Sequence, residues 1–308
     1  MSARTQALPQ ARARPQWQRR WFNRETGVAW LFILPSVIGF AVFYAVPAVR
    51  GLLMSTTNWD LLTTPKSVGL ANYAQLLNDN QFWHSLLVTV YYVLLNIPVQ
   101  TVLAIAIAVL MDRFTKSTVL RGLLIVPWLM PMVVAGLLFT WLLDPSLGII
   151  NTVLQSIGIT NVKFFGSVTQ AMPSVALVNI WRHMGYMALL VFAGLQTIPK
   201  PLYEAGAMDG ANEWRLFWSI TLPLLRPVLV FVIVTSVIGS FQVFDVIAVT
   251  TKGGPVDATR VVVWYIYEYA FQRFQMGYAT TISMALFLIL VSVSFLQMRM
   301  MRAGESEE

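Results

Sequence analysis

Long apolar runs alternate with short polar segments along most of the chain. Six of these runs are long enough to cross a hydrocarbon core of about 30 Å, since a helix needs about 20 residues to do so. They lie near residues 28–50, 82–111, 119–143, 172–197, 226–250 and 277–299. The pattern predicts an all-α, polytopic membrane protein with six transmembrane helices. A basic tail, residues 1–27, is expected to be disordered, and a short acidic tail covers residues 300–308.

The polar interruption at residues 199–223 differs from a simple loop between spans. Its sequence, PKPLYEAGAMDGANEWRLFWSITLP, predicts two helices joined by a turn at Asp209-Gly210. The second helix, from about Asn212 to Ile220, is expected to carry one bulky apolar face. That face suits either a docking surface for a partner or an interfacial helix on lipid headgroups.

Composition supports the membrane assignment. The 308 residues are 57% hydrophobic and 11% charged, whereas an ordinary soluble domain is about 25% charged. The absence of cysteine excludes disulfides and thiolate metal sites, and two histidines are too few for a histidine-rich metal cage.

The net charge of +7 has a topological explanation. Six arginines lie in the first 27 residues, and most other basic residues fall in polar segments that alternation of the spans places on the same side. By the positive-inside rule, both termini and the 199–223 hairpin are therefore expected in the cytoplasm. Because the basic residues follow the topology, nucleic acid is not an expected partner, whereas the lipid bilayer is.

Catalytic and nucleotide-binding motifs are missing. The sequence contains no GxxxxGK[ST], HExxH, GxSxG or GxGxxG. We therefore expect neither catalytic nor metal-binding residues nor a cofactor on this chain, and any ATP hydrolysis would occur on another one. Two alternatives stay open: an ion- or proton-coupled secondary transporter, although no inverted repeat is evident, and an integral-membrane enzyme.

Polar residues within the fourth and fifth runs are the candidate solute-binding residues, because such groups usually face the bundle interior. They are Asn179, Arg182, His183, Tyr186, Ser236, Ser240, Gln242 and Asp245. Arg182 and Asp245 could form an ion pair, which would leave a neutral sugar as the solute. Alternatively, Arg182 could bind a phosphate or another anionic group. Pro127 and Pro131, one turn apart in the third run, could bend that span toward the pathway.

Several motifs resemble one family of transporters. Glu204-Ala205-Gly206, Asp209-Gly210-Ala211, Phe217, Ile220 and Leu222-Pro223 resemble the coupling loop of binding-protein-dependent ATP-binding-cassette importers, whose consensus reads EAA, DGA and I-x-L-P. Gly206 stands where the consensus has alanine. VGLANY at 68–73, KGGP at 252–255 and GYA at 277–279 resemble sugar-type permeases of the maltose and glycerol-3-phosphate kinds. The resemblance covers residues 28–299.

This resemblance implies a type I importer permease fold and an alternating-access mechanism. The expected assembly has a second permease subunit as a heterodimer, two ATPase subunits that carry ATP and Mg, and an external solute-binding protein. It would lie in the plasma membrane of a prokaryote and import an oligosaccharide or a polyol phosphate. The implied ATPase-coupling residues are Glu204, Ala205, Gly206, Asp209, Gly210, Ala211, Phe217, Leu222 and Pro223.

For the solute site, the resemblance to maltose-type permeases extends only to Asn179, Tyr186 and Ser236. Arg182 and His183 depart from that pattern, which argues against a neutral disaccharide.

Overall fold

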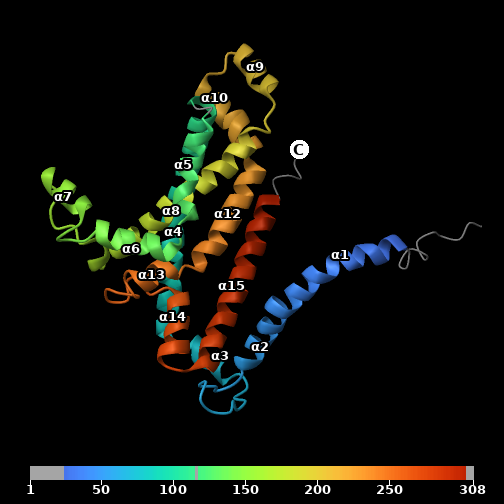
Figure 1. The fold of residues 1–308 in the computed structure, drawn as a ribbon, viewed down its shortest axis with the longest axis vertical. Helices are drawn as coiled ribbons and strands as arrows, with labels where there is room; N and C mark the ends of the chain where they lie inside the picture. Colours follow the sequence, from blue (N-terminus) through green and yellow to red (C-terminus); the bar gives the residue numbers. More distant parts are fainter. Residues whose placement is uncertain (1–23, 115–116, 303–308) are drawn as a thin grey trace, which may run out of the picture. The chain divides into compact units, whose positions relative to one another are not determined.

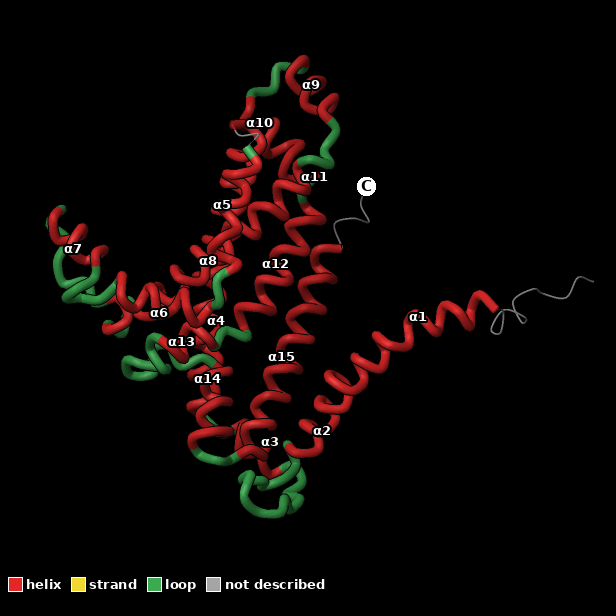
Figure 2. The backbone as a smooth tube through the Cα atoms, viewed as in Figure 1, coloured by secondary structure: helices red, strands yellow, loops and turns green. Residues whose placement is uncertain are grey.

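The computed structural model describes residues 24–114 and 117–302, with side chains for residues 27–114 and 117–300. The described residues form helices joined by loops and contain no strand (Figure 2). Most of the two predicted tails lies outside the described residues. The chain divides into two units, residues 1–53 and 54–308.

The described part of the first unit is one long apolar helix in three parts, which ends at the first residue of the second unit, Met54. They are α1 (Arg24–Phe40), a π-helical turn η2 (Ala41–Ala45) and α2 (Val46–Met54). From Gly27 to Leu53 no residue is buried. The segment Gly27–Met54 is long and apolar enough to cross a membrane, as predicted for the first span.

The second unit contains the other predicted spans and the helices between them (Figure 1). In chain order its elements are α3 (Ala71–Leu77), α4 (Asn80–Phe114), α5 (Thr118–Leu129), α6 (Met132–Leu142), α7 (Ile149–Ser156), η3 (Phe164–Gly166), α8 (Ala171–Leu195), α9 (Lys200–Met208), α10 (Glu213–Leu216), η4 (Phe217–Thr221), α11 (Leu222–Leu224), α12 (Arg226–Phe241), α13 (Asp245–Val249), α14 (Val262–Tyr267), η5 (Glu268–Gln272) and α15 (Met276–Arg302).

Helix α4 lies at the centre of this unit, packed against α8, α12 and α14. Its fully buried Ala104 and Ala108 belong to a core cluster with Ala188 and Val191 of α8. Small residues at such a crossing let two backbones approach closely in lipid. Tight packing in this part of the bundle positions the ends of α8 and α12, between which the hairpin is inserted.

The third predicted span is broken rather than straight. Helices α5 and α6 meet at an angle of 91°, so the span predicted over residues 119–143 is two helices with a sharp bend between them. Pro131 has no N–H to continue the helix, and Met130 before it takes extended angles (φ −72°, ψ 138°). The predicted bend at these prolines is present, and it frees the Met130 carbonyl for a bond outside the helix.

The motifs at 68–73 and 277–279 have a structural purpose at the end of the bundle opposite the hairpin. The Asn72 amide donates to the carbonyls of Ser55 (2.8 Å) and Thr57 (2.9 Å). A Cβ atom at Gly277 would overlap the Thr57 carbonyl, so only glycine fits there. Together these contacts fasten the loop before α3 to the start of α15.

Asp79 ties three helices together at the same end. Its Oδ1 accepts from the backbone N–H groups of Gln81 (2.9 Å) and Phe82 (3.3 Å), which caps α4. Its Oδ2 accepts from the hydroxyls of Tyr265 and Tyr278, each at 2.6 Å. Burial raises the pKa of Asp79, but the hydrogen bonds from Tyr265, Tyr278 and the backbone outweigh burial and leave the pKa below its ordinary value.

We expect Asp79→Ala to lower the free energy of unfolding by about 2–4 kcal/mol, since it removes a helix cap and two bonds to a charged group. Because the folded-state pKa lies below the unfolded value, this stabilisation is complete above the unfolded pKa and is lost as pH falls through the folded one. Thermal unfolding of the detergent-solubilised protein from neutral to acidic pH measures both effects. Asp60→Ala is the control, because the hydrogen bonds of Asp60 to described residues all lie within its own exposed loop. An equal loss in both variants would contradict the role of Asp79.

Candidate functional site: an ordered hairpin and an intramembrane cavity

Residues 199–223 fold as the predicted pair of helices. Helix α9 begins after Pro199 and ends at Met208, and Gly210 turns the chain with φ +77°. The Asn212 side chain then caps α10 by accepting from the Arg215 N–H (2.9 Å). The second helix continues through the π-helical turn η4 instead of remaining regular, and it ends in α11, which contains Pro223.

The two arms of the hairpin are braced against each other. The hydroxyls of Tyr203 in α9 and Thr221 in η4 lie 3.0 Å apart and share a hydrogen bond. A Cβ atom added at Gly206 would lie 2.6 Å from Leu216 Cδ2 and 3.2 Å from Ile220 Cδ1. Gly206 therefore seats α9 directly against the second arm, and the hairpin is an ordered unit.

The predicted coupling residues divide by exposure. One set faces outward and is available to a partner: Glu204, Ala205, Asp209, Gly210 and Pro223. The other set is half-buried where the arms meet or where the second arm meets the bundle: Gly206, Ala211, Phe217 and Leu222. The first set suits contact with another protein, whereas the second holds the shape of the hairpin.

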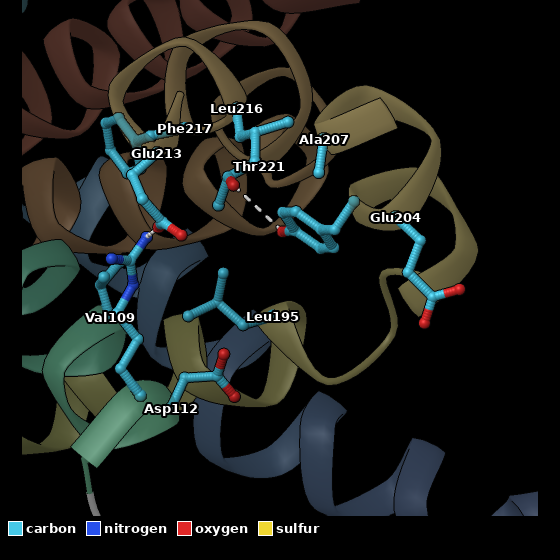
Figure 3. A pocket seen from close by; sticks show the side chains of 11 residues that line it. Val109, Asp112, Leu195, Glu204, Ala207, Glu213, Leu216, Phe217 and Thr221 are labelled. Atoms are coloured by element: carbon cyan, nitrogen blue, oxygen red, sulfur yellow. Dashed lines mark hydrogen bonds and ion pairs between the residues drawn. The ribbon is translucent and has the colours of Figure 1, made fainter. Parts of the chain in front are cut away.

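The hairpin is also attached to the end of α4. Arg113 forms an ion pair with Glu213 at the start of α10. Between the hairpin and the ends of α4 and α8 lies a pocket of about 370 Å³, shown in Figure 3 with the Tyr203–Thr221 hydrogen bond and the ion pair at Glu213. A displacement of the hairpin would thus reach α4 as well as α8 and α12.

Gly206 allows a test of this bracing. We expect Gly206→Ala to be tolerated, because the nearest atom is the mobile end of the Leu216 side chain. Gly206→Leu should separate the arms and reduce transport by about tenfold or more, since overpacking costs about 1–3 kcal/mol. Uptake into proteoliposomes of the assembled transporter measures the effect. Equal uptake by the Ala and Leu variants would show that the close approach is unimportant.

A polar cavity of about 260 Å³, open on one side, lies beside the middle of α8 and the junction of α12 with α13. Five of the eight candidate solute-binding residues line it: Asn179, Arg182, His183, Gln242 and Asp245. Met132, at the start of α6, and Phe244 complete much of its wall. The bend in the third span therefore faces this cavity.

Two contacts hold Arg182 in place. Its Nε–H donates to the Met130 carbonyl (2.9 Å), the group freed by the break between α5 and α6. Its Nη1 lies 3.0 Å from His183 Nε2, and His183 Nδ1 lies 2.9 Å from the Asn179 carbonyl. A guanidinium can only donate, so Nε2 accepts and the proton of His183 sits on Nδ1. The imidazole is therefore neutral and leaves the charge of Arg182 in place.

The direct ion pair expected between Arg182 and Asp245 is not formed. Within residues 27–114 and 117–300, no Arg182 nitrogen comes within 4.0 Å of an Asp245 oxygen. The two charges line the same cavity and attract each other without contact. The reason is that the Met130 carbonyl and His183 Nε2 hold the guanidinium through its Nε and Nη1 atoms.

The other three candidates lie outside the cavity lining. Ser236 and Ser240 are buried, and they accept hydrogen bonds from Gln100 (3.3 Å) and Asn96 (3.0 Å) of α4. The Tyr186 ring stacks on Trp128 of α5 with centroids 4.5 Å apart. In this structure these side chains join helices to one another, and their role as solute contacts stays a prediction.

Asn96 and Gln100 are structural residues that the motifs did not reveal. Asn179 donates to Asn96 Oδ1 (2.9 Å), so one network links α4, α8 and α12 beside the cavity. The available signal was their spacing of four residues within an apolar run, which places both amides on one helix face. The break at Met130 also had a signal in the sequence, since the residue before a proline, here Pro131, tends to leave the helix.

Membrane-length helices around a polar cavity, together with an ordered hairpin outside the spans, are features of a transport permease. Among the described residues, five helices are long and apolar enough to cross a membrane, or six if the bent pair counts as one span. The family model described as "Binding-protein-dependent transport system inner membrane component" matches residues 100–300. The chain belongs to this family, and its role is that of a multi-pass membrane transport subunit, not an enzyme.

Individual relatives agree with this assignment. The chain is 31% identical to the sulfoquinovosyl glycerol transport system permease protein SmoG of Agrobacterium fabrum, over 99% of this chain and 100% of the relative. It is 32% identical to the trehalose/maltose transport system permease protein MalF of Thermococcus litoralis, over 91% of this chain and 95% of the relative. The predicted likeness to maltose-type permeases is confirmed.

A solved structure supports the fold. A bacterial alginate ABC transporter, in complex with an alginate pentasaccharide-bound periplasmic protein, aligns with a TM-score of 0.80 at 23% identity. The alignment covers 93% of this chain and 98% of that one. The likeness confirms the predicted all-α importer permease fold. The family and the relatives favour neither of the two alternative functions.

Proposed function

We propose that this chain is one half of a heterodimeric permease that imports a carbohydrate or a polyol phosphate. Its relatives SmoG and MalF are named for sulfoquinovosyl glycerol and for trehalose and maltose. An external solute-binding protein delivers the solute, and the cavity beside Arg182 forms part of its path. Asn179, His183, Gln242 and Asp245 supply the polar contacts, and Tyr186, Ser236 and Ser240 come into reach only if the helices rearrange.

The driving force comes from two separate ATPase subunits that bind ATP and Mg. The 199–223 hairpin docks on one of them in the cytoplasm, where both termini of the chain also lie. The observation that supports this most strongly is the internal bracing of the hairpin together with its attachment to α4. A braced hairpin transmits displacement to three spans, and the spans then alternate between inward-facing and outward-facing states.

The natural absence of cysteine allows a clean test, since any introduced thiol is unique. Met208 on the hairpin is 88% exposed and Leu62, in the loop after the first span, is 83% exposed. We expect Met208→Cys to react with an impermeant maleimide only from the cytoplasmic side and to cross-link to the ATPase. Leu62→Cys, the matched control, should react only from outside and give no cross-link.

The opposite labelling pattern would overturn both the orientation and the docking. Correct labelling of Met208→Cys without a cross-link at any hairpin position would retain the orientation and refute docking through this hairpin.

A further inference from the structure

Arg182 has unused hydrogen-bonding capacity beside the cavity. A guanidinium carries five N–H donors, and the Met130 carbonyl and His183 take one each. No further hydrogen bond or ion pair to Arg182 occurs among the described residues, so three donors stay available at the cavity wall. These donors lie on a planar group that matches the two oxygens of a carboxylate, a sulfonate or a phosphate.

The position of Arg182 is fixed before any solute arrives. The Met130 carbonyl belongs to a backbone break, and the neutral ring of His183 is itself bonded to the Asn179 carbonyl at 2.9 Å. Because these partners carry no net charge, they orient the guanidinium without neutralising it. Such preorganisation lowers the entropy lost when a ligand is bound.

Asp245 supplies a hydrogen-bond acceptor in the same cavity. A carboxylate can only accept hydrogen bonds, and the cavity contains this carboxylate apart from the guanidinium. A ligand bearing only negative charge would be repelled by Asp245, whereas sugar hydroxyls can donate to it. The amides of Asn179 and Gln242 can serve further hydroxyls. The lining thus suits a ligand with an anionic group at one end and hydroxyls at the other.

The cavity is open on one side, because Gln242 and Asp245 in its lining are exposed. Its volume of about 260 Å³ can hold one sugar-sized group, and the rest of a longer solute would extend beyond it.

Building on the proposed importer function, we infer that Arg182 binds a carboxylate, sulfonate or phosphate group on a polyhydroxylated solute, while Asp245 accepts hydrogen bonds from its hydroxyls. Arg182 is then a specificity-determining residue, and His183 and Met130 are positioning residues for it. The solute is an acidic carbohydrate or a polyol phosphate in preference to a neutral sugar.

The test begins with the compound that the solute-binding protein carries when purified from cells, identified by mass spectrometry. Its ATP-driven uptake is then measured in proteoliposomes that contain the complete transporter. We expect the compound to carry an anionic group. Arg182→Gln should reduce its uptake by about tenfold or more, because bonds to charged groups are lost. Arg182→Lys should reduce uptake less, since it keeps the charge and loses the planar fork.

The control is Arg273→Gln, because Arg273 lies over the Tyr269 ring (4.4 Å) and away from the cavity. This variant should retain uptake. Because the Arg182 and Arg273 variants are measured with the same binding protein, the selectivity of that protein cannot cause a difference between them. If the complex with Arg182→Gln fails to assemble, as judged by gel filtration, uptake by the Arg182→Lys variant tests the inference in its place.

The inference is overturned if the carried compound is neutral, or if the assembled Arg182 variants import an anionic compound as well as the wild type does. Either result leaves the importer function intact. Failure of the wild-type complex to take up the carried compound with ATP would instead refute the proposed function.

Discussion

Replacing Gly210 with valine is expected to uncouple ATP hydrolysis from transport. Gly210 turns the chain between the two arms with φ +77°, a conformation that a β-branched residue adopts at a cost of about 1–3 kcal/mol. Only a few contacts hold the two arms of the hairpin together, such as the Tyr203–Thr221 hydrogen bond, and strain of this size can break them. Uptake into proteoliposomes should fall by about tenfold or more, since about 1.4 kcal/mol corresponds to a factor of ten. ATPase activity should continue, no longer stimulated by the loaded binding protein.

Two further substitutions, Gly210→Asn and Gly210→Ala, distinguish two causes of lost uptake: backbone strain in the hairpin and a clash with the docked ATPase subunit. Apart from its two neighbours in the chain, no described residue has an atom within 4 Å of a Cβ placed on Gly210. Asparagine is bulkier than alanine but tolerates the left-handed conformation. If strain is the cause, Gly210→Asn retains more uptake than Gly210→Ala. The reverse order would show that the partner surface excludes any side chain there, and full uptake in the valine variant would refute the lever.

Replacing Asn96 with leucine is expected to weaken the bundle itself. Asn96 is 1% exposed, donates to Ser240 (3.0 Å) and accepts from Asn179 (2.9 Å). Leucine has a similar volume but leaves the buried Ser240 and the half-buried Asn179 without this partner, at about 1–3 kcal/mol for the buried group and less for the other. In lipid the net loss is smaller, because individual hydrogen bonds between spans contribute about 0.6 kcal/mol on average. Thermal unfolding of the solubilised complex should shift downward by several degrees.

The matched control lies on the same helix. The Thr101 hydroxyl is buried and has no hydrogen-bond partner within the described part of the chain. Thr101→Val should therefore leave the unfolding temperature unchanged or raise it. A loss in Thr101→Val equal to that in Asn96→Leu would mean that any change in this part of α4 is harmful, and that the network has no special role.

Most of the architecture could be predicted from the sequence, because every span must be an apolar helix of about 20 residues to cross the bilayer. The apolar runs predicted the long helices, and Asp209-Gly210 predicted the turn of the hairpin, with its second helix starting near Asn212. Pro127 and Pro131 indicated a bend in the third span. The angle of 91° was not predictable, because it depends on how α6 packs against α13.

The cavity was harder to predict, because a polar side chain in a span can face a solute path or another helix. Ser236 and Ser240 face Gln100 and Asn96, which are more than 130 residues away in the sequence. Periodicity shows that two residues share a face and not what that face meets. The ion pair of Arg182 with Asp245 is absent for a related reason. Pro131 indicates that the helix breaks near Met130, but the sequence does not show which side chain will bond the freed Met130 carbonyl.

Reconstitution tests the central claim most directly, namely that this chain conducts solute while a separate subunit supplies the energy through the 199–223 hairpin. Solute accumulation is measured in vesicles that contain the chain and its permease partner, with and without the ATPase subunits and Mg-ATP. We predict accumulation only when the ATPase, nucleotide and loaded binding protein are all present. Accumulation by the permease chains alone, without nucleotide, would contradict the account.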